Sequence, residues 1–374
     1  MIPVIDLFAG PGGLGEGFSS LRDAENKPVF QTIMSIERDK QAHQTLRLRS
    51  YLRKIAEPDG TLPRVYLRYM KKHDNETFDQ LIRYRPKEWQ AACEEALCDE
   101  LVDGDDRLVK LGAERVTRWF EDRDRGPLVL IGGPPCQAYS LVGRSRRKHD
   151  ITFEEDPKHT LYRCYLSFIN ELKPDVFVME NVKGLLSAKH EGHGVFNRIC
   201  KDMEEAGYTI HSLVTDDPHN PKDYVVKAEQ YGIPQMRHRV ILLGIKNDTG
   251  IEPSTLTKKH VCTLGSALRG LPKLRSGFSE RNENWRDMNW AEYINSAAKE
   301  LKDNGECNDL TDILDRVISR YAPKLTAKHK VDPVLNRYEE WYRGSLGNSK
   351  VLTNHESRSH LASDLDRYLF CAAY

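Results

Sequence analysis

The sequence predicts an α/β fold with a doubly wound sheet, and three kinds of observation lead to this prediction. Short apolar runs, typical of buried strands, recur up to residue 244. A glycine-rich turn follows the first run, and a helix is expected after it. Polar and charged side chains follow several runs directly, which places them at the sheet edge where such folds bind ligands.

The first apolar run, at residues 4–8, leads into the glycine-rich turn. Gly10, Gly12 and Gly15 match the pattern G-x-G-x-x-G, in which glycine allows a ligand close to the backbone. A second run, at residues 29–36, ends at Glu37, whose carboxylate can accept hydrogen bonds from ribose hydroxyls. Together these features predict a cofactor that contains adenosine. The alternative for Glu37 is a solvated residue at the start of a helix.

The next two strand ends carry groups suited to catalysis. Residues 128–131 lead into the sequence GGPPCQ, which places Cys136 just past a strand in a stiff Pro-Pro turn. A thiol held there is better suited to act as a nucleophile than to pack as a small buried apolar side chain, which is the usual role of cysteine. Residues 175–179 are followed by Glu180, whose apolar neighbours would raise its pKa and make it a proton donor. The alternative for Glu180 is a capping or surface acid.

Arginines precede the last buried run, at residues 240–244. Gln235, Arg237 and Arg239 alternate along the chain, so they share one face if the segment is extended. Two guanidinium groups on one face suit a base edge or phosphates. The alternative is a solvated strand face.

The motifs DLFAGPGG, GGPPCQAYS, ENV and QMRHR, in this order, resemble the cytosine-5 DNA methyltransferase family over residues 1 to about 275. The resemblance implies a Rossmann-like, S-adenosylmethionine-dependent methyltransferase sheet. It implies methyl transfer to carbon 5 of cytosine in double-stranded DNA, through a covalent cysteine adduct on a flipped base. The catalytic residues it implies are Cys136, Glu180, Arg239, Arg237 and Gln235. The S-adenosylmethionine contacts it implies are Phe8, Gly10, Pro11, Gly13, Glu37, Pro135 and Leu161.

The family also has a loop after the cysteine that closes over DNA. In this sequence the loop region carries a basic cluster, which suits phosphate contact, with a solvated charge run as the alternative. The implied DNA contacts are Gln137, Ser140, Arg144, Arg146 and Arg147.

The sequence departs from the family pattern in two places. Residues 46–112 read as a helical insertion in a catalytic domain at 1–250, and the insertion hides the acidic residue expected to contact the adenine amine. Residues 251–374 read as a linker and a mostly helical extension, without the family's target-recognition region and last motifs. We therefore expect the catalytic half of a split enzyme of restriction-modification or phage defence, with a second polypeptide that covers an exposed apolar patch. A truncated gene or an incomplete chain are the alternatives.

Composition narrows the class of protein. Lysine plus arginine equals aspartate plus glutamate at 56 each, so any DNA-binding surface must be locally basic. Mean hydropathy is −0.62 and no apolar run reaches the length of about 20 that spans a membrane, which predicts a cytoplasmic protein without a membrane segment. Eight cysteines without a CxxC pair predict reduced thiols and no metal site. An RNA cytosine methyltransferase and a catalytically silent regulatory subunit remain alternatives, whereas a nicotinamide dehydrogenase explains only the glycine-rich turn.

Overall fold

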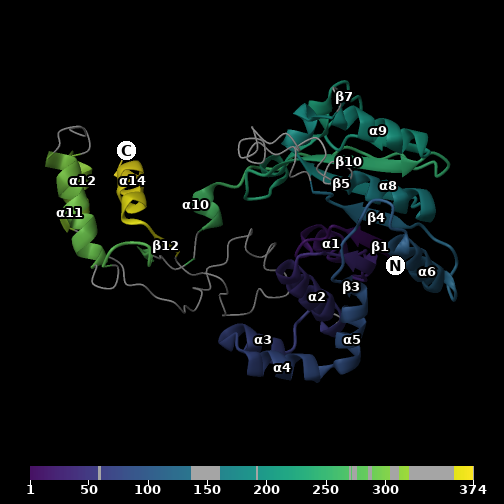
Figure 1. Cartoon of the computed structure of the whole chain (residues 1–374), viewed down its shortest axis with the longest axis horizontal. Coiled ribbons are helices and arrows are strands. Elements are labelled where there is room, and N and C mark those ends of the chain that lie inside the picture. The colour runs from purple at the N-terminus through teal and green to yellow at the C-terminus, as the bar shows by residue number, and fades with distance from the viewer. Residues whose placement is uncertain are drawn as a thin grey trace. The chain divides into compact units, whose positions relative to one another are not determined.

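The computed structural model describes residues 1–57, 60–135, 161–190, 193–268, 271, 276–284, 289–303, 311–319 and 358–373. They belong to two compact units, residues 1–63 with 79–267 and residues 64–78 with 268–374 (Figure 1). The predicted nucleophile and DNA-contacting residues lie outside the described residues: Cys136, Gln137, Ser140, Arg144, Arg146 and Arg147.

The first unit is built on a mixed sheet with the strand order β3-β2-β1-β4-β5-β10-β8, and β9 pairs with β10. Strands β1 to β5 are parallel, whereas β10 is antiparallel to both β5 and β8. The order reverses between β1 and β4, and such a switch point is where open α/β sheets bind ligands at their carboxyl edge. The strands are β1 Ile2–Leu7, β2 Phe30–Ile36, β3 Ala96–Leu97, β4 Val129–Gly132, β5 Val176–Val182, β8 Tyr208–His211, β9 Val225–Lys227 and β10 His238–Lys246.

Helices cover both faces of this sheet, which confirms the predicted doubly wound α/β class. Ile5 and Leu130 belong to the core that contains side chains of α6 and α8, whereas Val4 and Ile131 pack with side chains of α1 on the opposite face. Because both faces are covered, the strands are almost entirely apolar. The helices of this unit are α1 Gly13–Ser19, α2 Lys40–Ile55, α5 Pro86–Glu95, α6 Arg107–Phe120, α8 Leu161–Leu172, α9 Val195–Glu205 and α10 Leu264–Ala267.

Shorter elements complete the first unit. Strands β6 and β7 form a separate two-stranded sheet. Their bounds and those of the three short 3-10 helices are β6 Lys189–His190, β7 His193–Gly194, η4 Lys183–Ser187, η5 Pro221–Tyr224 and η6 Ala228–Tyr231.

Strand β5 is longer than the sequence predicts. The apolar run ends at residue 179, but the strand continues to Val182, so Glu180 lies inside the strand and not after it. The reason is the antiparallel partner β10, which pairs with β5 along its whole length and places Ile241 opposite Glu180. A carboxylate is tolerated in this strand because it lies near its carboxyl end.

The stretch predicted as a helical insertion, residues 46–112, is not one continuous helical segment. It contains α5 and the helices α3 Arg64–Lys72 and α4 Asn75–Tyr84, but also β3, which pairs with β2 at the edge of the sheet. Helix α6, which begins at Arg107, packs against β1 and β2. Helix α5 belongs to the unit that contains the sheet, α3 belongs to the second unit, and α4 spans the boundary between residues 78 and 79. The domain boundary at residue 250 stays a prediction.

The second unit contains a small parallel sheet and a helical core. Strand β11, Gly277–Phe278, pairs with β12, Ser359–His360. Apolar side chains of α11 Trp290–Asp303, α12 Thr311–Ser319 and α14 Ala362–Ala373 form a core with Phe278. In the part of the chain that the structure describes, no helix combines the length and the apolar character needed to cross a membrane.

Candidate active site

Glu180 and two arginines converge at the carboxyl edge of the sheet. Nε of Arg239 lies 2.7 Å from Oε1 of Glu180, and a terminal nitrogen of Arg237 lies 3.6 Å from the same oxygen. The Nε–H of Arg239 does not point at the oxygen, so the contact is an ion pair and not a hydrogen bond. The convergence follows from topology, because the first residues of an antiparallel strand lie beside the last residues of its partner.

The environment of Glu180 differs from the apolar one that the sequence predicts. Its side chain is 28% exposed and faces two guanidinium groups. The apolar residues of β5 surround its backbone, but alternation along the strand turns them towards the covered faces of the sheet.

The turn that leads into Cys136 is held against this carboxylate. A Cβ added to Gly133 would lie 3.2 Å from Oε2 of Glu180, so only glycine permits this approach. The buried amide of Asn181 donates a hydrogen bond of 3.1 Å to the carbonyl of Pro134. The sequence motif contains Asn181, but its role was not predicted; the signal was a polar residue inside an apolar strand, which must find a partner when buried.

Gln235 is not brought to the site. Its side chain is exposed and makes no hydrogen bond within the described ranges of the chain. The backbone N–H groups of Gln235 and Arg237 each donate to the carbonyl two residues earlier, at 2.8 Å. The segment before His238 is therefore turned and not extended, so the alternation that predicts a shared face does not apply there.

The loop between β1 and α1 has a left-handed backbone at three positions: Phe8 with φ 54°, Gly10 with φ 57° and Gly12 with φ 88°. A Cβ at Gly12 would lie 3.0 Å from the side chain of Leu46 in α2, so this position needs glycine for two reasons. A Cβ at Gly10 or at Gly13 would meet no described atom within 4 Å. That side of the loop is open to a ligand.

Glu37 ties this loop to the end of β2. Its carboxylate accepts hydrogen bonds from the backbone N–H of Gly10 at 2.8 Å and from that of Asp39 at 2.6 Å. The structure thus brings together Phe8, Gly10 and Glu37 as the sequence predicts. Pro11 is exposed beside them, Pro135 is half-buried at the end of the described part of its turn, and Leu161 begins α8 and packs on the main core.

The structure offers Asp99 for the acidic residue that the sequence did not reveal. The backbone N–H of Glu37 donates to the carbonyl of Leu97 at 3.0 Å, so the residues that follow β3 lie beside the end of β2. Both oxygens of Asp99 accept hydrogen bonds from Arg107, at 2.7 and 2.9 Å, and these bonds lower its pKa. Strand β3 has only two residues, too short a run to be recognised in the sequence.

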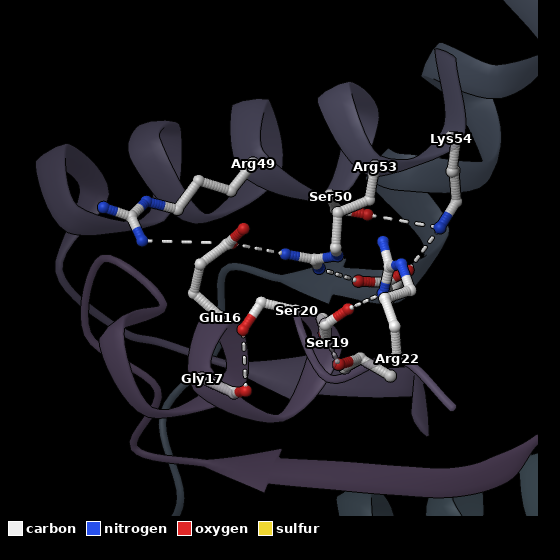
Figure 2. A network of polar contacts seen from close by, with 11 residues as sticks. Glu16, Gly17, Ser19, Ser20, Arg22, Arg49, Ser50, Arg53 and Lys54 are labelled. Carbon is white, nitrogen blue, oxygen red and sulfur yellow. Dashed lines mark hydrogen bonds and ion pairs between the residues drawn. The ribbon is translucent and has the colours of Figure 1, made fainter. Parts of the chain in front are cut away.

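A chain of ion pairs connects α1, α2 and α5 behind the glycine loop (Figure 2). One terminal nitrogen of Arg53 lies 3.0 Å from Glu16, and the other lies 2.8 Å from Glu95. Lys54 contacts the second oxygen of Glu95, whose side chain is only 6% exposed. The network therefore links α1, the helix after the glycine loop, to α5 through α2.

Asp6 is buried beneath the same loop. Burial raises the pKa of its carboxyl to about 7, although Arg53 and a hydrogen bond from the backbone N–H of Gly15 act in the opposite direction. Its Oδ1 has no hydrogen-bond partner in the part of the chain described here. A Cβ at Gly15 would lie 2.7 Å from Oδ2, so the helix can approach Asp6 only through glycine.

Comparison with known proteins identifies the family of the chain. A family model described as C-5 cytosine-specific DNA methylase matches residues 121–359. The type II methyltransferase M.Bpa9945I of Bacillus paralicheniformis is 32% identical over 257 residues, which are 67% of this chain and 55% of the relative. The type II methyltransferase M1.HphI of Haemophilus parahaemolyticus is 30% identical over 55% of this chain and 50% of the relative. A DNA-cytosine methyltransferase of Escherichia coli is 27% identical over 66% of this chain and 43% of the relative. The chain spans about half the length of the curated relatives it matches.

Proposed function

Because the chain belongs to the C-5 cytosine-specific DNA methylase family, we propose that it carries the catalytic site for methyl transfer from S-adenosylmethionine to carbon 5 of cytosine in duplex DNA. The observation that carries the proposal is the convergence of Glu180, Arg239 and the Gly133–Pro134 turn at one sheet edge. The names of the type II methyltransferase relatives support a role in restriction-modification.

The residues at the switch point fit S-adenosylmethionine, which when bound supplies the methyl group. The open side of the loop at Gly10 and Gly13 admits a ligand close to the backbone. Glu37 stands at the end of β2, where an acceptor for ribose hydroxyls is needed. We assign Asp99, two residues after β3, to accept from the adenine amine.

The chain's own residues divide the work on the flipped cytosine. Cys136 acts as the nucleophile, and its thiolate forms a bond to carbon 6 while the electrons of the carbon 5–carbon 6 double bond become available at carbon 5. Glu180 donates a proton to ring nitrogen 3 as the thiolate adds, and Arg239 and Arg237 hold the carboxyl group in place. The electrons at carbon 5 would form the bond to the methyl group, and S-adenosylhomocysteine would be the leaving group. Loss of the carbon-5 proton to water then re-forms the carbon 5–carbon 6 double bond and expels the thiolate, and nitrogen 3 returns its proton to Glu180.

The test is transfer of labelled methyl from S-adenosylmethionine to unmethylated duplex DNA by this chain, with Cys136→Ser as the matched variant. We expect the variant to lose transfer and to keep cofactor binding, because a hydroxyl is a far weaker nucleophile than a thiolate. A second probe is duplex DNA that contains 5-fluorocytosine, which lacks the carbon-5 proton and should hold wild-type protein in a denaturant-resistant adduct. Full activity of Cys136→Ser would refute the covalent mechanism.

The need for a second polypeptide is a further part of the proposal. Support comes from large exposed apolar side chains after β10: Ile251, Leu256, Val261 and Leu264. The transfer assay is therefore repeated with the product of the adjacent reading frame. Activity only in the mixture identifies a split enzyme, and activity on RNA in place of DNA identifies the RNA methyltransferase. Failure to bind S-adenosylmethionine identifies a regulatory subunit.

A further inference from the structure

Helix α3, Arg64–Lys72, which is labelled in Figure 1, carries a stripe of positive charge. Its four cations are Arg64, Arg68, Lys71 and Lys72, it contains no acidic residue, and all four cations are exposed. At 3.6 residues per turn these positions fall within an arc of about 100°. The half-buried residues Tyr66 and Met70 lie on the opposite side of the helix, so the stripe faces away from the packed side.

The stripe lies in the most basic stretch of a chain with no net charge. Residues 38–87 contain thirteen lysines and arginines against six aspartates and glutamates, a net charge of +7, whereas the whole chain has 56 of each kind. Some cations elsewhere in this stretch are used internally: Arg53 and Lys54 pair with Glu95, and Arg38 pairs with Glu100.

Three of the four cations of the stripe are not used in this way. Arg64, Lys71 and Lys72 make no ion pair with any residue in the described ranges of the chain. The nearest acid in the sequence, Asp74, is engaged by Thr77, whose backbone N–H and hydroxyl donate to it at 2.8 and 2.6 Å. The hydrogen bonds from Thr77 and the charge of Lys72 lower the pKa of Asp74. Arg64 and Lys71 are therefore exposed without a carboxylate partner among the described residues.

We propose that the α3 stripe binds the phosphate backbone of duplex DNA, as a contact additional to the catalytic site; the inference rests on the proposed function. The nine residues of α3 extend about 12 Å, which matches three to four phosphates of one strand at about 3.4 Å per phosphate. A row of cations on a helix without acids fits a polyanion. A membrane surface fits poorly, because an interfacial helix must present its apolar face, and here that face is half-buried.

The test compares two triple variants of the full chain that change the net charge equally. Arg64→Gln/Lys71→Gln/Lys72→Gln removes the stripe cations, and Lys27→Gln/Lys110→Gln/Lys222→Gln removes three exposed lysines elsewhere. Binding to a labelled 30-base-pair duplex is measured by fluorescence anisotropy between 50 and 200 mM salt. Each lost phosphate contact lowers the slope of log Kd against log salt by about 0.9, so we expect a fall of about 2.7 in the stripe variant. The control slope should change by less than 1.

Equal slopes in the two variants would overturn the inference and leave the proposed function intact. A change seen with an RNA hairpin of equal charge, but not with the duplex, would also overturn it in favour of RNA. If wild-type protein binds no duplex, the inference fails, and calorimetric binding of S-adenosylmethionine then decides whether the proposed function fails with it. If the circular dichroism spectrum of the stripe variant equals that of the wild type, unfolding is excluded as the cause of a smaller salt dependence of Kd.

Discussion

Replacing Glu95 by alanine tests the network that joins α1, α2 and α5. The Glu95 side chain is 6% exposed, and its partners Arg53 and Lys54 are 22% and 23% exposed. Removing one partner of a fully buried ion pair costs about 3–5 kcal/mol, because the remaining charge is left uncompensated. Since both cations keep some access to water, we expect a loss of about 2–3 kcal/mol, less than the fully buried case.

The suitable assay is hydrogen exchange of peptides from α5 and β3, because local opening reports on this part of the chain without requiring two-state unfolding of two units. A loss of 2–3 kcal/mol corresponds to exchange about 30 to 150 times faster, at 1.4 kcal/mol per tenfold change. Peptides from β10, on the far side of the sheet, should keep their wild-type rates and serve as an internal control.

Glu16→Gln is the matched control in the same network. The Glu16 side chain is 41% exposed, so its ion pair with Arg53 contributes at most about 1 kcal/mol to the free energy of unfolding. The reasoning fails if exchange in α5 changes less than threefold in Glu95→Ala. It fails equally if Glu16→Gln has the same effect as Glu95→Ala, since burial is the argued cause of the difference.

Three further predictions concern the sheet and the site. Gly244→Ala places a Cβ against the Phe177 ring across β5 and β10, so we expect a loss of about 1–3 kcal/mol in the urea unfolding free energy and recovery when Phe177→Leu is added. Glu180→Gln should lower methyl transfer at least about 100-fold while the calorimetric Kd for S-adenosylmethionine changes less than twofold, because the change removes proton transfer and the ion pairs with Arg239 and Arg237 but no proposed cofactor contact. The pKa of Asp6 rises from 3.8 to about 7 on folding, so the folded protein binds more protons in this window and its stability falls as pH rises. The unfolding free energy of wild type should therefore decrease between pH 4 and pH 7 relative to Asp6→Asn, and an equal slope for both proteins would contradict the burial of a charge.

The parts of the fold that sequence predicted are those fixed by short-range pattern. The run that ends at Gly132 is apolar on both faces, and the run that ends at Glu37 is rich in apolar residues, so composition marks β4 and β2 as strands. The glycine-rich turn is equally local, because Gly12 is required both by its own backbone angle and by the approach of Leu46. These predictions, and the family resemblance built on them, are confirmed.

The remaining features depend on pairing between distant segments. Strand β5 extends through Glu180 only because β10 pairs beside it, and no local pattern reports that partner. Strand β3 has two residues and forms because β2 offers an edge, so it is too short a run to recognise in the sequence, and Asp99 beyond it could not be proposed from pattern. Gln235 was placed by an alternation rule that holds only in extended chain, and two backbone turns before His238 break it.

Net charge is a poor guide to binding in this chain because its charges are segregated. The stretch 38–87 carries +7, so the remainder carries −7 by difference from zero. Some of the acidic side chains form ion pairs within the fold. Glu95 and Glu100, which lie just after this stretch in the sequence, pair with cations of the stretch. Electrostatic attraction to a polyanion depends on charges within about one Debye length, roughly 8–10 Å, and α3 presents four cations within about 12 Å. A chain that is neutral as a whole can therefore present a strongly positive surface to DNA on one helix.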